Sequence, residues 1–295
     1  MTSGILNLDK PQGWTSHDVV ARVRRLTGER RVGHAGTLDP LATGVLLVCL
    51  GAATRLTEYL QAAPKTYRAT VRLGLATDTG DAEGAVVATR PVPPLSSEDL
   101  ERALAAFRGT IAQRPPIYSA IKQGGVPLYR RARRGEEVTP PPRQVTIYAL
   151  DFIAWAPPDL TLLIVCSAGT YIRSLAHDLG ERLGCGGHLI SLCRTASGRF
   201  RLEEAISLED LAAAVARGDW ARFVLPPHWA LDGFLPVAVG AEEEARLRHG
   251  QELPCPTPPR TEQGYALSAQ GDVVALLRYE ADRRSWRPYK VFTVG

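Results

Sequence analysis

The sequence has few cysteines and no long apolar run. Its five cysteines among 295 residues show no paired spacing, which is typical of reduced thiols in a cytosol rather than of a disulfide framework. No apolar run reaches the ~18 residues that a membrane span needs. The first residues also lack the charged and apolar regions of a secretory signal. We therefore expect a cytoplasmic protein that does not enter a membrane.

Motifs for common cofactors, metals and nucleophiles are also missing. The sequence contains no phosphate-binding loop, no dinucleotide fingerprint and no serine or cysteine nucleophile motif. The set formed by Cys185, His188 and Cys193 lacks a well-spaced fourth ligand for zinc. The acidic loop over residues 77–84 does not have the spacing of a calcium-binding EF-hand. We expect neither a cofactor nor a metal.

Positive charge is concentrated in one segment of the chain. Residues 122–143 hold six basic and two acidic residues, and this difference of four equals the formal net charge of +4 of the whole chain. The segment includes Lys122, Arg130 and Arg133. A basic patch predicts contacts with phosphates and hence with a nucleic acid. The alternative is a solvated surface loop.

The chain is long enough for a large core and for two domains, and its periodicity predicts both strands and helices. Thr15 and Asp18 form a capping-box pattern at the start of a helix that Gly28 ends. Residues 66–75 alternate as in a strand with one buried face. We expect further strands at 4–8, 45–50, 144–155, 160–167 and 188–192, and further helices at 53–61, 96–107, 171–183, 208–216 and 241–249.

The most informative segment is residues 33–44, with the sequence GHAGTLDPLATG. Its three glycines allow positive φ angles and close approach of the backbone to a ligand. Pro40 favours an extended conformation for Asp39, and the apolar run 45–50 follows. The pattern predicts a stiffly presented carboxylate at the edge of a buried strand, which suits a nucleophile. An aspartate in an ordinary turn is the alternative.

Segment 33–44 resembles the signature of the TruB-type family, the tRNA pseudouridine-55 synthases. Three more segments resemble motifs of this family in the same order, namely 4–16 (GILNLDKPQGWTS), 65–68 (KTYR) and 169–173 (GTYIR). The resemblance implies that the chain isomerises one uridine in the T loop of tRNA to pseudouridine after the base leaves its stack. It implies that Asp39 attacks either the sugar C1′ atom or the uracil ring, and that no cofactor is needed.

The resemblance also assigns roles to other residues near Asp39. Arg173 is expected to pair with Asp39 and to keep it anionic. Tyr67 is expected to stack on the extruded base or to transfer the proton of its C5 atom. His34 is expected to occupy space beside the flipped base, with acid–base catalysis as the alternative. Asp81 is expected to orient an arginine.

The remaining expected residues contact the substrate. Leu192 resembles the apolar residue that lines the uracil pocket in the family, where two arginines often follow it. In this chain Cys193 takes the first of these positions and only Arg194 remains. The expected contacts with RNA and substrate are completed by Lys10, Lys122, Arg130, Arg133 and Arg194.

The resemblance implies an α+β fold with a mixed, mostly antiparallel sheet that helices flank. Residues 1–230 are expected to form the catalytic domain, with an inserted thumb-like segment at about 112–142 that grips RNA. Residues 231–295 are expected to form a small PUA-like β-barrel. We expect a monomer that needs no partner protein. Two alternatives stay open: a tRNA-binding or folding module with secondary or no catalysis, and a related synthase that acts on ribosomal RNA.

Overall fold

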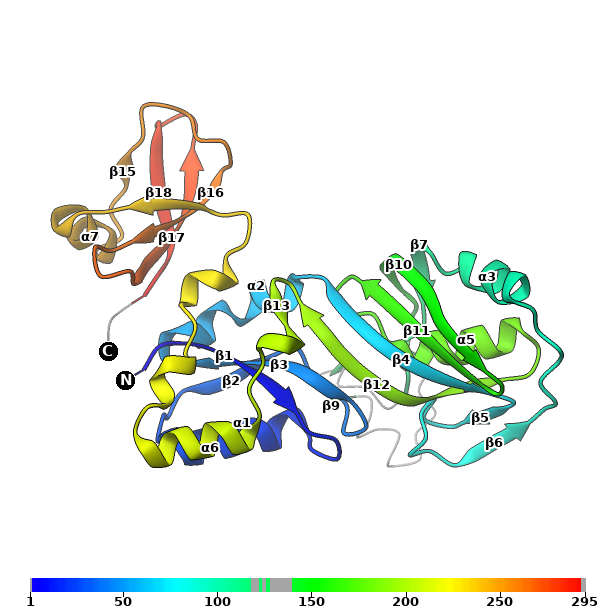
Figure 1. Cartoon of the computed structure of the whole chain (residues 1–295). Helices are drawn as coiled ribbons and strands as arrows, with labels where there is room; N and C mark the ends of the chain where they lie inside the picture. The colour runs from blue at the N-terminus through cyan, green and yellow to red at the C-terminus, as the bar shows by residue number, and fades with distance from the viewer. Residues whose placement is uncertain (1, 118–121, 124–125, 128–139, 293–295) are drawn as a thin grey trace.

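The structure is a computed structural model that describes residues 2–117, 122–123, 126–127 and 140–292 (Figure 1). No helix in these ranges is long and apolar enough to cross a membrane. All five cysteines lie within the described ranges and are free thiols. The chain forms a long sheet with helices, and a smaller body stands beyond one end of that sheet.

Among the described residues, nine strands form the large sheet in the order β1-β3-β12-β4-β11-β10-β7, with β2 beside β3 and β13 beside β12. Only β3 and β12 pair in parallel, and the other described pairs of this sheet are antiparallel. The expected mixed, mostly antiparallel sheet is confirmed. Its strands are β1 (Gly4–Lys10), β2 (Val32–Ala35), β3 (Thr43–Leu50), β4 (Lys65–Leu73), β7 (Gly109–Gln113), β10 (Arg143–Ala156), β11 (Asp159–Cys166), β12 (Gly187–Ser197) and β13 (Phe200–Arg201).

The apolar run on β3 is buried on both faces of the sheet. Leu46 and Val48 belong to one hydrophobic cluster, while Leu47 and Cys49 belong to another. Side chains on a strand point alternately to the two faces, so a run without polar residues fits a strand that is covered on both sides. The prediction of a buried strand at 45–50 is confirmed.

Four helices pack their apolar stripes against one face of the sheet and share the first hydrophobic cluster. They are α1 (Ser16–Thr27), α3 (Ser97–Ala105), α5 (Ile172–Arg182) and α6 (Leu208–Arg217). The capping box of Thr15 and Asp18 is present at α1, and Gly28 ends the helix with a φ of 73°. Local capping chemistry therefore fixes α1, the helix that lies next to the Asp39 loop.

The predicted helix over 53–61 is correct only in its second half. Residues Gly51–Leu56 form a 3₁₀-helix and α2 covers Thr57–Ala62. Gly51 has a φ of 57°, and the Thr54 hydroxyl donates to its carbonyl oxygen at 2.7 Å. Such a local side-chain bond competes with the α-helical pattern. Shorter 3₁₀ turns cover Leu202–Glu204, Trp220–Phe223 and Pro227–Ala230.

Two hairpins form separate two-stranded sheets. Strands β5 (Leu75–Thr77) and β6 (Val86–Thr89) form one, and β8 (Lys122–Gln123) and β9 (Val126–Pro127) form the other. The predicted strand over 66–75 ends earlier, at Leu73, because Gly74 has a φ of 91°. This turn starts the hairpin whose loop carries Asp81.

The C-terminal body contains a five-stranded sheet among its described residues, in the order β14-β16-β17-β18-β15, and one helix. It has its own apolar core around Val274 and Leu277. The path of described pairs stays open, so the expected closed barrel is not seen. The elements are β14 (Leu235–Ala238), α7 (Ala241–Arg248), β15 (Leu253–Pro254), β16 (Gln263–Leu267), β17 (Val273–Glu280) and β18 (Ser285–Val291).

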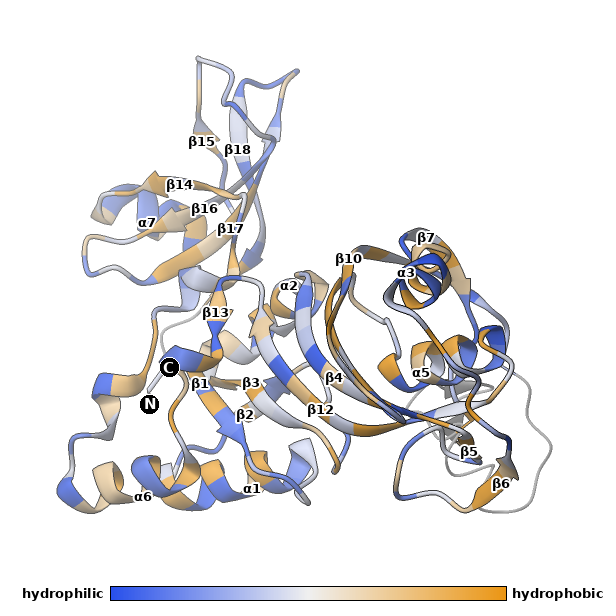
Figure 2. Cartoon of the chain, turned by 45° about the vertical axis from the view of Figure 1, so that its right-hand side comes forward, coloured by the Kyte–Doolittle hydropathy of each residue, from blue (hydrophilic) through white to orange (hydrophobic). Residues whose placement is uncertain are grey.

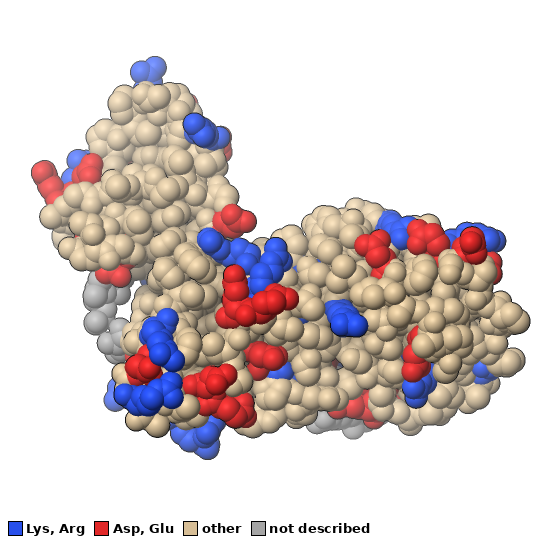
Figure 3. All heavy atoms as spheres, in the orientation of Figure 1, with Lys and Arg blue, Asp and Glu red and all other residues tan. Residues whose placement is uncertain are grey.

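The C-terminal body is docked on the face of β1 and β3 that lies opposite the four helices. Leu276 and Phe292 share a cluster with Ile5 and Leu47 of the large sheet. Apolar segments of both bodies meet near α2 and β13 (Figure 2). Charged side chains of both signs are interspersed over the face shown in Figure 3. The docking therefore fixes the C-terminal body on the side of the sheet away from α1 and α6.

Candidate active site

The loop between β2 and β3 presents Asp39. Gly36 and Gly44 lie at its two ends with φ angles of 94° and 95°, while Gly33 lies in β2 and does not need a positive φ. A Cβ atom on Gly44 would lie 2.3 Å from the carbonyl oxygen of Arg194. The prediction of a positive φ is confirmed for Gly36 and Gly44 and wrong for Gly33. At Gly44 the close approach of β12 is a second reason for glycine.

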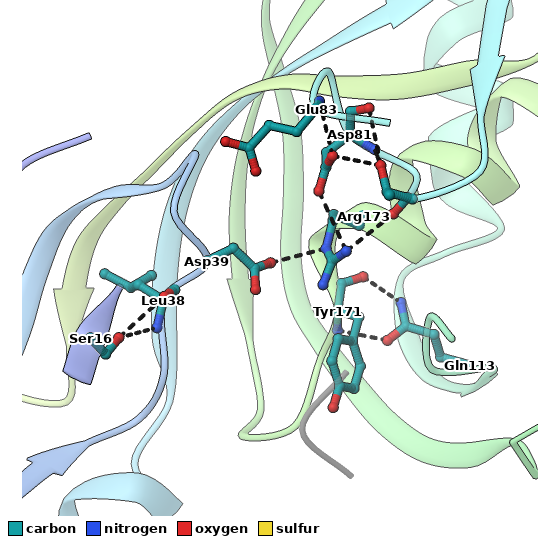
Figure 4. A network of polar contacts seen from close by, with 9 residues as sticks. Ser16, Leu38, Asp39, Asp81, Glu83, Gln113, Tyr171 and Arg173 are labelled. Atoms are coloured by element: carbon teal, nitrogen blue, oxygen red, sulfur yellow. Dashed lines mark hydrogen bonds and ion pairs between the residues drawn. The ribbon is translucent and has the colours of Figure 1, made fainter. Parts of the chain in front are cut away.

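Asp39 forms an ion pair with Arg173, the second residue of α5. The Nε atom of Arg173 lies 2.9 Å from an Asp39 carboxylate oxygen, and its Nη1 atom lies 3.4 Å from an Asp81 carboxylate oxygen. The same Nη1 atom donates to the Thr79 carbonyl at 3.2 Å. The Arg173 side chain is 7% exposed, whereas that of Asp39 is 40% exposed. Figure 4 shows the guanidinium between the two carboxylates.

Opposing effects set the pKa of Asp39. Desolvation raises this pKa above its ordinary value, Arg173 lowers it, and the Asp81 charge raises it again. Because 40% of the side-chain surface of Asp39 is exposed, solvent screens part of these charge interactions. The guanidinium is the strongest influence that favours the anion, so the arrangement holds an aimed carboxylate with one side open to a ligand.

Tyr67 and Leu192 lie on the helix-covered face of the sheet near this pair. Leu192 on β12 is opposite Ala69 on β4, so its side chain is diagonal to Tyr67 on the same face. Both side chains are largely buried, with 8% of Tyr67 and 7% of Leu192 exposed. Burial raises the pKa of Tyr67, the nearby Arg194 charge opposes this rise, and the Asp39 charge adds a smaller rise. The phenol therefore stays protonated and near the carboxylate.

His34 on β2 is half-buried and contacts a second histidine. Its ring lies edge-on to His17 of α1, with 5.2 Å between the ring centroids and an angle of 84°. Desolvation lowers the pKa of His34 to about 4, and the nearby charges of His17 and Arg194 act in the same direction. A neutral imidazole fits the expected space-filling role better than that of a general acid at neutral pH.

The structure does not place Lys10 and Arg194 where a substrate phosphate could reach them. Lys10 is 0% exposed and Arg194 is 1% exposed. The Lys10 ammonium donates to the carbonyls of Trp14 at 2.5 Å and Pro40 at 3.4 Å. Arg194 donates to the carbonyls of Val45 at 2.7 Å and Gly36 at 3.1 Å. Buried cations are retained here because backbone oxygens satisfy them, and both support the Asp39 loop.

The expected basic contacts of the thumb-like segment are only partly within the described residues. Arg130 and Arg133 lie outside the described ranges, and for Lys122 the structure describes only its place on β8. Asp81, by contrast, lies within the described residues. It is 4% exposed and accepts hydrogen bonds from the Thr79 hydroxyl at 2.6 Å and the Glu83 amide at 3.1 Å.

Two supporting residues were missed by the sequence analysis. Ser16 bonds the backbone of Leu38, and Gln113 bonds the backbone of Tyr171. Their partners are 22 and 58 residues away in the sequence, so no local pattern could identify them. The part of the chain that the structure describes holds no group of three or more metal-ligating side chains. What the site offers is an oriented carboxylate beside an aromatic and an aliphatic side chain.

Family profiles match most of the large body. Residues 24–172 match the TruB family pseudouridylate synthase N-terminal domain. Residues 173–232 match the tRNA pseudouridylate synthase B C-terminal domain. The first match contains Asp39, Tyr67 and Asp81, and Arg173 opens the second.

Curated relatives are similar over nearly the whole chain. The tRNA pseudouridine synthase B of Dehalococcoides mccartyi is 44% identical over 98% of this chain and 96% of its own length. The enzyme of the same name from Ralstonia nicotianae is 48% identical over 93% of this chain and 88% of its own length. A solved structure of an H/ACA RNP bound to a substrate RNA containing 2'-deoxyuridine contains a similar chain. It has a TM-score of 0.75 and 26% identity, over 99% of this chain and 85% of that one.

Proposed function

Because the chain belongs to the TruB family of pseudouridylate synthases, we propose that it isomerises a uridine of tRNA to pseudouridine, at position 55 in the T loop. One observation supports this most directly. The Asp39 carboxylate is held 2.9 Å from a buried guanidinium, yet 40% of its side-chain surface is exposed. The geometry suits a group that reacts with a bound ligand, and the relatives named tRNA pseudouridine synthase B supply the substrate class.

The proposed reaction moves one bond without a net transfer of atoms. The target uridine leaves its stack to reach the site. Asp39 then attacks either the sugar C1′ atom or the uracil ring. The bond between N1 and C1′ breaks, the uracil turns, and a bond forms between C5 and C1′. The hydrogen on C5 leaves as a proton, N1 takes up a proton, and Asp39 is regenerated.

The neighbouring side chains would receive and hold the flipped base. The Tyr67 ring offers an aromatic face for the uracil. Its hydroxyl is a candidate for the transfer of the C5 proton, and because the phenol is protonated, it would accept that proton only as it passes its own proton on to another base or to water. Leu192 adds an apolar wall on the same face of the sheet. The neutral His34 beside the loop would occupy space beside the flipped base.

Contacts that hold the rest of the tRNA are proposed for two further regions. We assign the segment at about 112–142 to a thumb that grips the T stem-loop, on the basis of its basic residues. We assign residues 231–295 to a PUA-like domain and residues 1–230 to the catalytic domain, and the end of the family match at residue 232 supports this division. Phosphate contacts of this kind make binding sensitive to salt. We also propose a cytoplasmic monomer without an obligate partner protein.

The test follows the hydrogen on C5 of uracil. A tRNA transcript labelled with tritium at this atom is incubated with the wild type, Asp39→Asn and Asp159→Asn. The wild type should release tritium from one position, and a transcript without uridine 55 should release none. Asp39→Asn should bind the transcript and release none. Asp159→Asn is the matched control, because this carboxylate pairs with Arg72 at 2.7 Å on another part of the sheet.

The outcomes separate this proposal from its alternatives. Salt-sensitive binding without release from any tRNA would leave a tRNA-binding or folding module. Release from a ribosomal RNA fragment but from no tRNA would favour the related rRNA-directed synthase. Release by Asp39→Asn at the wild-type rate would keep the reaction but remove Asp39 from the centre of the site.

A further inference from the structure

Two buried side chains lie on either side of the ion pair of Asp39 and Arg173. Each side chain both donates a hydrogen bond to the backbone and accepts one from it. Ser16 is 1% exposed and Gln113 is 2% exposed. Each accepts a hydrogen bond from one backbone amide and donates one to the carbonyl of the same residue. Figure 4 shows one on each side of the pair.

Ser16 fixes the residue before Asp39. The amide of Leu38 donates to its hydroxyl oxygen at 2.9 Å, and the hydroxyl lies 3.2 Å from the Leu38 carbonyl oxygen to which it donates. Thr15 already caps α1, so the hydroxyl of Ser16 is not needed for capping. Its two bonds tie the first turn of α1 to the Asp39 loop and leave the backbone at Leu38 little freedom to move.

Gln113 fixes the start of the helix that carries Arg173. The amide of Tyr171 donates to the Gln113 side-chain oxygen at 2.8 Å, and the side-chain nitrogen donates to the Tyr171 carbonyl at 2.9 Å. Tyr171 is the N-cap residue of α5 and makes no side-chain capping bond. The last residue of β7 therefore holds the helix start in place of a local cap, two residues before Arg173.

We propose that Ser16 and Gln113 are positioning residues for the reaction. From opposite sides, they hold Asp39 and Arg173 in the relative position that the ion pair requires. This inference rests on the proposed function. The paired atoms are only 2.9 Å apart, so a shift of either backbone segment moves the carboxylate relative to the bound base. A misplacement of about 1 Å in such a site can lower a rate on the order of 10²-fold.

The test compares Ser16→Ala and Gln113→Ala with two matched controls. Ser96→Ala removes a hydroxyl that accepts the Asp99 amide at 3.2 Å at the start of α3. Asn7→Ala removes a buried amide that donates to the Arg201 carbonyl at 2.8 Å. Single-turnover tritium release at saturating enzyme, RNA affinity and the thermal midpoint are measured for each variant across pH.

Both positioning variants should lose about 10²-fold in the single-turnover rate with RNA affinity unchanged. The controls should lose thermal stability and keep the rate. The acid limb of the rate should also move to higher pH in both positioning variants, because a looser contact with Arg173 raises the pKa of Asp39. Rates equal to those of the controls, or slower rates with an unmoved acid limb, would overturn the inference.

Gln113→Glu keeps the size of the side chain and tests the same point if Gln113→Ala does not fold. Its ionised carboxylate still accepts from the Tyr171 amide but no longer donates to the Tyr171 carbonyl, whereas the protonated form does both. The rate of this variant relative to the wild type should therefore rise as pH falls, and a constant ratio would count against the proposed role. Release of tritium by the wild type but not by Asp39→Asn is checked first, so a failure of the proposed function is seen separately.

Discussion

Replacement of Arg173 by methionine removes the charge that opposes the rise in the pKa of Asp39 and keeps an unbranched side chain. The guanidinium contacts Asp39 at 2.9 Å and Asp81 at 3.4 Å. Two unit charges about 4 Å apart interact by roughly 4 kcal/mol at an effective dielectric constant of about 20. With 40% of the Asp39 side chain exposed, solvent screening reduces this to about 1–2 kcal/mol. Without this interaction, the pKa of Asp39 should rise further above its ordinary value.

The assay is single-turnover tritium release between acid and neutral pH. In the proposed reaction Asp39 acts as the anion, so a higher pKa moves the acid limb of the rate to higher pH. The plateau should also fall on the order of 10²-fold, because the carboxylate loses its orienting partner. Asp81, which is 4% exposed, loses its buried partner as well, and the free energy of unfolding should fall by about 3 kcal/mol.

Arg72→Met is the matched control. Arg72 makes a two-point contact with Asp159 at 2.7 and 2.8 Å, but this pair is more exposed and lies on the far part of the sheet. Because exposed ion pairs contribute little to stability, its loss should change the thermal midpoint only slightly and should leave the acid limb unchanged. An Arg173→Met protein with an unmoved acid limb would refute the assignment of Arg173 as the group that keeps Asp39 ionised.

Three further predictions concern individual residues. Gly44→Ala should lose most activity and at least about 1–2 kcal/mol of stability, because Gly44 has a φ of 95° and the new Cβ atom would lie 2.3 Å from a backbone oxygen. Urea unfolding measures the loss, and a stability equal to that of the wild type would contradict the prediction. The ring protons of His34 should titrate by NMR with a pKa of about 4, and His17→Asn should raise this pKa, whereas a midpoint at the ordinary 6.5 would refute its desolvation. A thiol reagent at neutral pH should modify the half-buried Cys255 well before Cys49, because burial raises the pKa of the Cys49 thiol to about 12. Equal rates of modification at the two cysteines would show that the sheet opens.

Much of the fold could be predicted from local pattern. The capping box at Thr15, the two-faced apolar run of β3 and the alternation of β4 each come from residues that lie next to one another in the sequence. The order of the strands could not be derived in this way, because β4 lies between β11 and β12. Such pairing depends on contacts between residues about a hundred positions apart. The family resemblance implied only a mixed, mostly antiparallel sheet, and the order of its strands is known from the structure.

The candidate site also contains residues that local pattern predicts and residues that it does not. Asp39 stands out locally because of the glycines and Pro40 around it. Its partner Arg173 required the resemblance. The expected phosphate contact of Arg194 is not what the structure shows, since a motif in the sequence gives the type of a side chain but not the direction in which the strand turns it. Ser16 ends the motif segment 4–16, but its bond to Leu38 could not be derived from local pattern, because the two residues are 22 positions apart.

Buried cations stabilise the loop that carries Asp39, which explains why the site can hold a carboxylate whose charged form desolvation disfavours. Lys10 and Arg194 bond backbone carbonyls at Pro40, Gly36 and Val45, so they restrain the loop without pairing with the reactive oxygen atoms. Had either cation paired directly with Asp39, it would have covered the open side of the carboxylate. Only Arg173 makes the direct contact among the described residues, and it does so through a planar group on one side. The other side of Asp39 therefore stays exposed, which the proposed reaction requires, while Arg173 offsets part of the cost of its charge.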